Sequence, residues 1–354
     1  MPEASSLRDL LRIRQANAGR LRRIPGYLGS AVGYKYHEDS DTFARDEDGA
    51  FIPAVLVFVR RKRPLDSIPP AERVPERLKG PKRLSCVTDV VTGALPAEAP
   101  EPRPFTAANR RLLRELHEDE MPWTGGMPIA SRFGTGTAAC VVRRGRTLGF
   151  LTNWHVAGFP GSRIVRPSPR LSLAGWTARA DLYAKHTRSK RDLESYIDRK
   201  TTRHRLDAAF IPFAKYIRKR DTHSGVHGLG PLGKPWCPDL DTMEPIGTRV
   251  VGVGQKLGLQ RGAIAAYGYE WRIDPEDEVF HVTDYLILGE GRQPFAAAGD
   301  SGKLVVTDDE DRRPIALLWG GQRQGFWSAE AQESWAYASR IDTVLKQLKL
   351  EIVR

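Results

Sequence analysis

From about residue 121 onward, the sequence is a succession of short apolar runs separated by turns that contain glycine. In chain order the runs are GTAACVV, TLGFLTNWHV, DAAFIPF, RVVGVG, AIAAYGYEW, VTDYLILG, KLVVTD and IALLWGG. Several short strands with turn residues between them are typical of all-β barrels and sandwiches. This pattern therefore predicts a mainly β region. A closing segment with apolar residues at near-helical spacing predicts a C-terminal helix over about 339–352.

The first 120 residues have a different texture. Residues 6–23 read as a basic helix that ends at Pro25 and Gly26, with a leucine stripe that either docks on the protein or serves a partner-binding arm. Three strand candidates follow, GSAVGYKY, AVLVFVRRK and CVTDVVTG, and then a Pro-rich linker over 94–104. A short helix is expected over 106–119, with Asn109, Arg110 and Glu115 exposed. We therefore expect an N-terminal α+β extension, with a domain boundary near residue 120.

Composition bears on the partners and the cellular compartment to be expected. The 354 residues carry a net charge of +12, which permits contact with acidic partners without requiring it. The three cysteines form no CxxC pair, and neither a secretory leader nor an apolar stretch of membrane-spanning length is present. A cytoplasmic protein without metal or cofactor is the expectation, and the Arg- and Ala-rich usage suggests a bacterial genome. The polar segment His186–Arg205 is expected to be a surface loop.

The segment FAAAGDSGKLVV, residues 295–306, raises the question of chemistry. Taken alone, its GDSG is a turn before a strand, since Gly, Asp and Ser are common turn residues. A serine becomes a nucleophile when a histidine accepts its proton and a buried carboxylate orients that histidine. Two upstream segments supply candidates: FLTNWHVAG places His155 after an apolar strand, and HRLDAAFIPF places Asp207 where another begins. The order is then His155, Asp207, Ser301.

Together these segments resemble a known family. LTNWHV, DAAFI and GDSGKLVV are similar, in this order, to the three signatures of trypsin-like (chymotrypsin-fold) serine peptidases. VGVGQKLGLQRGAI and IALLWGG extend the resemblance, which covers about residues 121–354. It implies two six-stranded antiparallel β-barrels, at about 121–225 and 240–340. GSAVGYKYHEDSD and PAVLVFVRRK resemble the N-terminal region of plant narrow-leaf-type peptidases and their bacterial relatives.

The resemblance implies a mechanism. Ser301 Oγ would attack the scissile carbonyl, His155 would accept and return its proton, and Asp207 would hold the imidazole. The N–H groups of Gly299 and Ser301 would bind the oxyanion. The residues implied for substrate binding are Phe295, Ala298, Trp319 and Gly320.

Departures from the family pattern carry their own expectations. Lys303 and Leu304 follow GDSG, and the direction of Lys303, to solvent or to the cleft, stays open. No Ile-Val-Gly-Gly activation site precedes the barrels, so Asp300 needs a partner other than a freshly cut N-terminus. We therefore expect a peptidase that is not activated by cleavage and that assembly or a partner can gate. Without an acid near Phe295, an apolar or small residue is expected before the cut.

The same residues bear on two other functions. A trypsin-like fold kept as a gated or inactive peptide-binding module stays open, because the three residues say nothing of whether the site is formed. The net charge of +12 suggests nucleic-acid binding as another function. The sequence, however, has no RNP-like, zinc-finger or P-loop motif. The expected partner is a protein or peptide substrate, homo-oligomer formation stays open, and neither nucleic acid nor membrane is expected.

Overall fold

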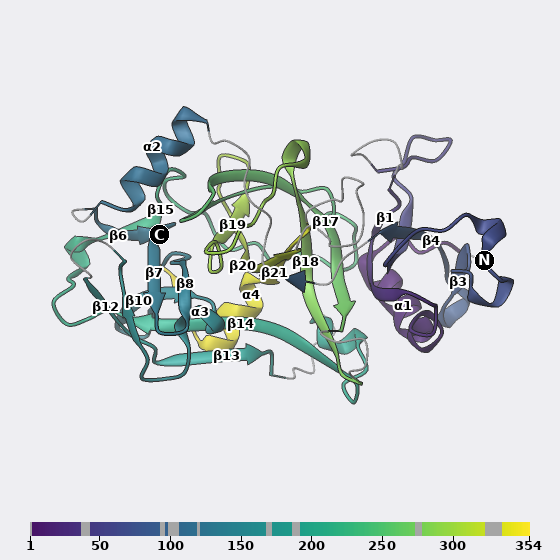
Figure 1. The fold of residues 1–354 in the computed structure, drawn as a ribbon, viewed down its shortest axis with the longest axis horizontal. Helices are drawn as coiled ribbons and strands as arrows, with labels where there is room; N and C mark the ends of the chain where they lie inside the picture. The colour runs from purple at the N-terminus through teal and green to yellow at the C-terminus, as the bar shows by residue number, and fades with distance from the viewer. Residues whose placement is uncertain are drawn as a thin grey trace.

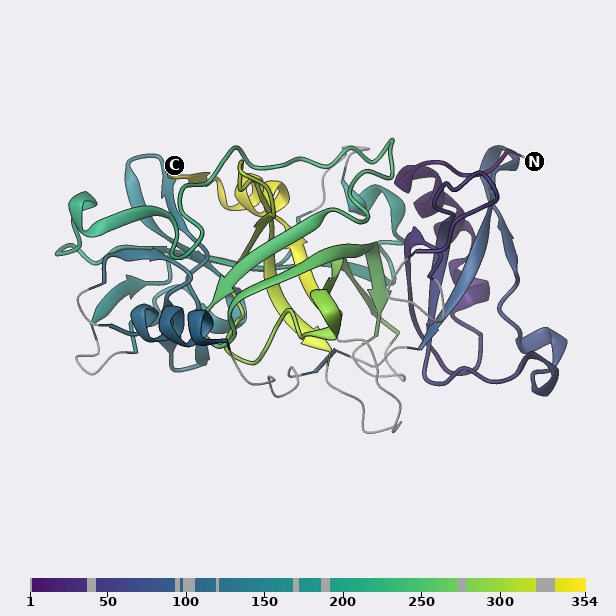
Figure 2. The ribbon, with the colours of Figure 1, turned by 90° about the horizontal axis from the view of Figure 1, so that it is seen from above.

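A computed structural model shows an elongated molecule with the N-terminal strands gathered at one end (Figures 1 and 2). The structure describes residues 2–36, 43–92, 96–97, 106–118, 121–167, 172–185, 192–272, 278–322 and 335–354. The fold is mainly β, as the short apolar runs predict. No helix within these residues is both long and apolar enough to cross a membrane.

The N-terminal region packs one helix against a few strands. Its elements are α1 (Leu7–Leu21), β1 (Tyr27–Tyr34), β2 (Pro53–Val59), β3 (Arg77–Lys79) and β4 (Ser85–Thr92). Helix α1 begins where the Ser6 hydroxyl accepts a hydrogen bond of 3.2 Å from the Asp9 N–H, which satisfies one of the free donors of the first turn. Its apolar face is buried in the core, so the leucine stripe is docked.

This region shares a sheet with the rest of the chain. Strand β1 pairs with the long strand β17 (Gly258–Trp271), with Gly29 opposite Trp271. A Cβ at Gly29 would lie 2.2 Å from the Glu270 carbonyl oxygen, so a glycine is needed for the two backbones to approach this closely. The N-terminal strands therefore extend the larger sheet and do not form a separate body.

The remaining elements fall into two groups. The first contains α2 (Ala107–Leu116), β6 (Trp123–Gly125), β7 (Pro128–Ser131), β8 (Gly134–Thr137), β9 (Val141–Arg144), β10 (Thr147–Thr152), α3 (Trp154–Ala157), β11 (Arg163–Val165), β12 (Leu173–Trp176), β13 (Arg179–Tyr183), β14 (Thr202–Pro212) and β15 (Thr222–Val226). The second contains β16 (Arg249–Gly254), β17, β18 (Phe280–Gly289), β19 (Leu304–Thr307), β20 (Pro314–Gln322), β21 (Trp335–Arg340), α4 (Ile341–Leu348) and β22 (Glu351–Ile352). A short strand β5 (Pro96–Ala97) pairs with β20.

Hydrogen bonds join strands of both groups into one large sheet. Its main order is β22-β9-β10-β14-β18-β21-β20-β19-β16-β17-β1-β2-β4-β3. Strands β12, β11, β7 and β8 form a separate four-stranded sheet, and β15 pairs with β6. The two groups meet where β14 runs parallel to β18, with Thr202 opposite Phe280. Two large apolar clusters fill the interior, one around β9, β10, β14 and α4, the other between α1 and the strands β17, β18 and β20. Closure into two six-stranded barrels stays a prediction.

Two segments differ in detail from the sequence-based expectations, and a third lies mostly outside the described residues. Helix α4 ends at Leu348, and the chain then adds strand β22 against β9, so the helix is shorter than the expected 339–352. In the part of His186–Arg205 that the structure describes, Leu193 and Tyr196 are buried and β14 begins at Thr202, so this part is not a surface loop. Glu194 and His204 of this part are buried and contact each other, whereas Asp198, Arg199, Lys200 and Arg203 are exposed, a division that polarity alone does not show. Most of the expected linker over 94–104 lies outside the described residues.

Candidate active site

His155 lies in the short helix α3, directly after strand β10. Its Nδ1 is 3.0 Å from Oδ2 and 3.1 Å from Oδ1 of Asp207, and its backbone N–H donates to the same Oδ1 at 3.1 Å. The His155 side chain is 35% exposed, whereas Asp207 is fully buried. A buried carboxylate thus holds one ring nitrogen, and the partly exposed side of the imidazole can meet a reactant.

Asp207 lies within β14 in an unusual backbone conformation. Its φ is +49°, which is uncommon for a residue other than glycine and stores strain. The Asn153 side-chain amide donates 2.7 Å to its carbonyl oxygen, which supports this conformation. Burial raises the pKa of Asp207, but the hydrogen bond and charge of His155 and the charge of Arg205 outweigh it and lower the pKa to about 2. The acid is therefore ionised at neutral pH.

Ser301 lies in the turn before β19, between two glycines with positive φ, Gly299 and Gly302. Its carbonyl oxygen accepts a 2.7 Å hydrogen bond from the Thr137 N–H at the end of β8. A Cβ at Gly136 would lie 2.7 Å from that oxygen and 2.5 Å from Val156 Cγ2, so β8 packs tightly between the turn and the residue after His155. In the described residues, no hydrogen bond joins the Ser301 hydroxyl to His155.

The two expected oxyanion donors are available. Within the described part of the chain, neither the Gly299 N–H nor the Ser301 N–H donates a hydrogen bond to another protein group. Gly299 has φ +103°, and a Cβ there would lie 2.5 Å from Gln255 Nε2. The Thr137 hydroxyl donates 3.1 Å to the Gly299 carbonyl, which fixes the next peptide of the turn.

Asp300 and Lys303 form a buried ion pair beneath this turn. Their charged groups are 3.7 Å apart and neither side chain is exposed. Asp300 also accepts backbone hydrogen bonds from Lys256 (2.9 Å), Leu257 (3.2 Å) and Ala297 (3.2 Å). Burial lowers the pKa of Lys303, while Asp300 opposes this shift. Lys303 thus points into the protein, and it is the partner that Asp300 needs in the absence of a cleaved N-terminus.

The residues expected to bind substrate lie in different surroundings. Phe295 is fully buried, with the Lys303 ammonium 4.4 Å from its ring centroid. Trp319 is 6% exposed, Gly320 is half-buried and Ala298 is exposed. Sequence reasoning missed Arg205, which contacts both Asp207 and Trp319. Its only signal was its position two residues before Asp207 on the same strand. No group of residues suited to hold a metal is found in the described part of the chain.

The mainly β fold and the contact of His155 with the buried Asp207, together with a GDSG turn, are those of a protein with a trypsin-like peptidase fold. Two family models match the sequence: the NARROW LEAF 1 N-terminal domain over residues 2–91 and the Nal1 C-terminal domain over residues 108–354. The chain therefore belongs to the Nal1 family.

Individual relatives agree. Protein NARROW LEAF 1 of Oryza sativa subsp. japonica is 32% identical over 379 residues, an alignment that covers 99% of this chain and 61% of that protein. A Bradyrhizobium tropiciagri protein named "Probable serine protease" is 26% identical over 392 residues, covering 98% of this chain and 48% of the relative. The chain thus spans only 61% and 48% of the length of these relatives.

Two solved structures that are similar to this chain are named as proteases. Protease A of Thermobifida fusca has a TM-score of 0.44 at 17% identity, over 65% of this chain and 97% of that one. A glutamic acid-specific serine protease has a TM-score of 0.45 at 12% identity, over 65% of this chain and 100% of that one.

Proposed function

We propose that the protein is an intracellular serine endopeptidase that cleaves protein substrates through an acyl-enzyme, with His155, Asp207 and Ser301 as its triad. The observation that carries the proposal is the contact of His155 Nδ1 with the fully buried Asp207 carboxylate, 3.0 Å away. An ionised acid in this place favours the ring tautomer with a proton on Nδ1, which leaves Nε2 free to accept a proton.

The proposed reaction has two halves. In the first, Ser301 Oγ forms a bond to the scissile carbonyl carbon while its proton passes to His155 Nε2. The tetrahedral intermediate then collapses, the C–N bond breaks, and His155 gives the proton to the leaving amine. In the second half, water forms a bond to the acyl carbon while its proton passes to His155 Nε2. The C–O bond to Ser301 then breaks, His155 returns the proton to Ser301 Oγ, and the carboxylic acid product leaves.

The oxyanion of both intermediates is proposed to bind the N–H groups of Gly299 and Ser301. Both donors are unengaged within the described residues, and the conformation at Gly299 favours a residue without Cβ. Loss of one such donor costs about 3 to 4 kcal/mol of transition-state stabilisation in enzymes of this kind. The buried Asp300–Lys303 pair supports the further proposal that the turn is held without cleavage of the chain.

The proposed setting and specificity rest on separate observations. All three cysteines are free, which suits a reducing compartment. Among the described residues considered for the pocket, Phe295 and Trp319 lie in the interior, Ala298 lies at the surface, and the nearby acid Asp300 is buried against Lys303, so none of them offers a free acid to an Arg or Lys before the cut. An apolar or small residue is the proposed preference. Digestion of a peptide library tests this preference. Cleavage mainly after Arg or Lys would contradict it.

Labelling of the intact protein with a fluorophosphonate probe tests the central proposal. Wild type is expected to be labelled, and Ser301→Ala and His155→Ala are not. Ser67→Ala, an exposed serine of the N-terminal region, serves as the matched control and is expected to be labelled like wild type. Labelling that persists in Ser301→Ala would overturn the assignment of the nucleophile.

One observation favours a second candidate function, a gated or inactive peptide-binding module. No hydrogen bond links the Ser301 hydroxyl to His155 among the described residues, and such a link is what activates a serine. Under this alternative, folded wild type is not labelled but still binds peptides. Addition of a binding peptide or protein that starts labelling would identify a gated enzyme.

A further inference from the structure

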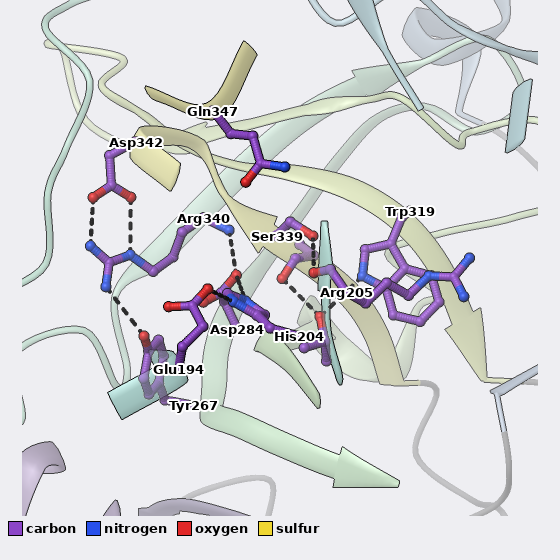
Figure 3. A network of polar contacts seen from close by, with 12 residues as sticks. Glu194, His204, Arg205, Tyr267, Asp284, Trp319, Ser339, Arg340, Asp342 and Gln347 are labelled. Atoms are coloured by element: carbon purple, nitrogen blue, oxygen red, sulfur yellow. Dashed lines mark hydrogen bonds and ion pairs between the residues drawn. The ribbon is translucent and has the colours of Figure 1, made fainter. Parts of the chain in front are cut away.

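Arg205 links the proposed triad to the strand that carries Trp319. It lies on β14, two residues before Asp207, and its Nη2 donates a 2.6 Å hydrogen bond to Asp207 Oδ2. Its guanidinium carbon is 4.3 Å from the ring centroid of Trp319 on β20. Figure 3 shows the Arg205 side chain lying over the Trp319 ring.

The surroundings hold Arg205 firmly in this place. The Ser339 hydroxyl of β21 donates 3.2 Å to the Arg205 carbonyl oxygen, and the Trp319 indole N–H donates 3.0 Å to the Thr283 hydroxyl of β18. The Arg205 side chain is 16% exposed. Three strands of the second group thus fix a cation from the first group against Asp207.

Charge makes this contact consequential. Among the described residues, Asp207 is the one carboxylate that pairs with Arg205. The charged or titratable groups acting on Asp207 are His155 from α3 and Arg205 from its own strand. On the neighbouring strand β13, Tyr183 lies opposite Arg205, while Arg179 and Asp181 pair with each other at 3.5 Å. One buried cation therefore balances the one buried acid behind His155.

We propose that Arg205 is a positioning residue that turns the Asp207 carboxylate toward His155 and, by its positive charge, keeps the His155–Asp207 pair from gaining a proton until the pH falls further. This inference rests on the proposed function. A cation 2.6 Å from the acid disfavours any added proton on the coupled pair, and protonation of that pair removes the base from the reaction. Arg205 touches neither the reacting atoms nor Ser301, so it acts through Asp207.

Two series of measurements test the proposal. The rate of fluorophosphonate labelling is followed against pH in wild type, Arg205→Met, Arg205→Gln and Arg205→Lys. The pH titration of the His155 ring, followed by NMR on the same proteins, reports on the pair without needing turnover. Arg203→Met is the matched control, since Arg203 is an exposed arginine of the same strand with its guanidinium 5.6 Å from the Tyr183 ring. Thermal unfolding shows whether each variant is folded, and Arg205→Gln replaces Arg205→Met if the latter is not.

The acid limb of labelling and the midpoint for proton uptake by the His155–Asp207 pair, read from the NMR signals, are both expected to move up by about one pH unit in the Met and Gln variants. Arg205→Lys, which keeps the charge, is expected to stay within a few tenths of wild type, as is Arg203→Met. An unmoved midpoint in folded Arg205→Met overturns the inference, because a purely structural role predicts that result. Wild type that is never labelled, with a midpoint that moves as expected, instead contradicts the proposed function and leaves the role of Arg205 on the pair supported.

Discussion

The Lys303 ammonium lies 3.7 Å from a carboxylate oxygen of Asp300, and both side chains are completely buried next to Ser301. Three backbone N–H groups complete the set of donors to the carboxylate. The ion pair is closed inside the same short turn, since the two residues are three apart in the chain. The conformation of the Ser301 turn therefore depends on a cation that the turn itself supplies.

Removal of the Lys303 charge is expected to destabilise the protein strongly. Lys303→Met leaves a buried carboxylate without its counter-ion, which destabilises proteins by about 3 to 5 kcal/mol. The double variant Asp300→Asn/Lys303→Met removes both charges and is expected to lose clearly less stability than the single one. Urea unfolding of the four proteins of the cycle measures the coupling. Equal losses in the single and double variants would show that the pair is not what holds the turn.

Gly299→Ala is expected to abolish or strongly reduce fluorophosphonate labelling. The added Cβ would meet Gln255 Nε2 at 2.5 Å, and a φ of +103° strains any residue with a side chain by about 1 to 3 kcal/mol. Gly19→Ala is the control, since Gly19 lies in α1 with no atom within 4 Å of an added Cβ. Labelling and melting temperature are measured together. Full labelling of Gly299→Ala would mean that the turn tolerates another conformation.

His204 predicts a pH dependence of stability. It lies between Asp284, 3.0 Å from its Nε2, and Glu194, which contacts its Nδ1; Figure 3 shows the three together. Burial lowers the pKa of His204, but Asp284 and Glu194 outweigh burial and raise the pKa to about 10. The folded state therefore binds a proton that the unfolded chain releases near pH 6.5. The stabilisation is complete below that pH and is lost as the pH rises toward about 10.

Comparison with a variant isolates this contribution, because other groups also titrate in alkali. The free energy of unfolding of wild type is expected to fall with pH between about 6.5 and 10 more steeply than that of His204→Gln, by up to about 1 kcal/mol per pH unit. Urea unfolding at half-unit pH steps measures both slopes. Identical slopes would show that His204 is neutral in the folded protein.

The side chain of Asn109 attaches helix α2 to the start of strand β17. Its side chain donates to the carbonyls of Leu257 (3.2 Å) and Leu259 (3.0 Å) and accepts from the Leu259 N–H at 2.9 Å. Asn109→Ala leaves these backbone groups, just before and at the start of β17, unpaired and is expected to lower the free energy of unfolding by about 1 to 3 kcal/mol. Arg114→Ala, on the exposed face of the same helix, is the control with little effect. An equally small effect of Asn109→Ala would show that α2 is not held by the following domain. That result would favour the boundary expected near residue 120.

Sequence reasoning located much of this fold because its signals are local. Alternating apolar runs and glycine turns marked the strands, and a leucine stripe followed by Pro25 and Gly26 marked α1. Three short segments in a given order indicated His155, Asp207 and Ser301. Asn109 was expected to be exposed, yet it pairs with β17, since its partners lie about 150 residues along the chain.

The same local reasoning failed for charged residues. His204 was read as part of a polar loop because its neighbours are charged, but it is buried between Glu194 of the same segment and Asp284 of the distant strand β18. The direction of Lys303 stayed open because a lysine after a turn is compatible with solvent and with burial alike. Neither case can be decided without knowing which side chains surround the residue.

The sequence alone thus determined where strands, turns and reactive side-chain types occur, since backbone preference and apolar periodicity depend on near neighbours. Only the tertiary structure decided which charges meet: Asp207 with Arg205, Asp300 with Lys303, and His204 with Asp284. The physical reason is that a buried charge is stable only beside a specific partner. Although two of these pairs are close in sequence, their burial is created by strands that come together from across the chain.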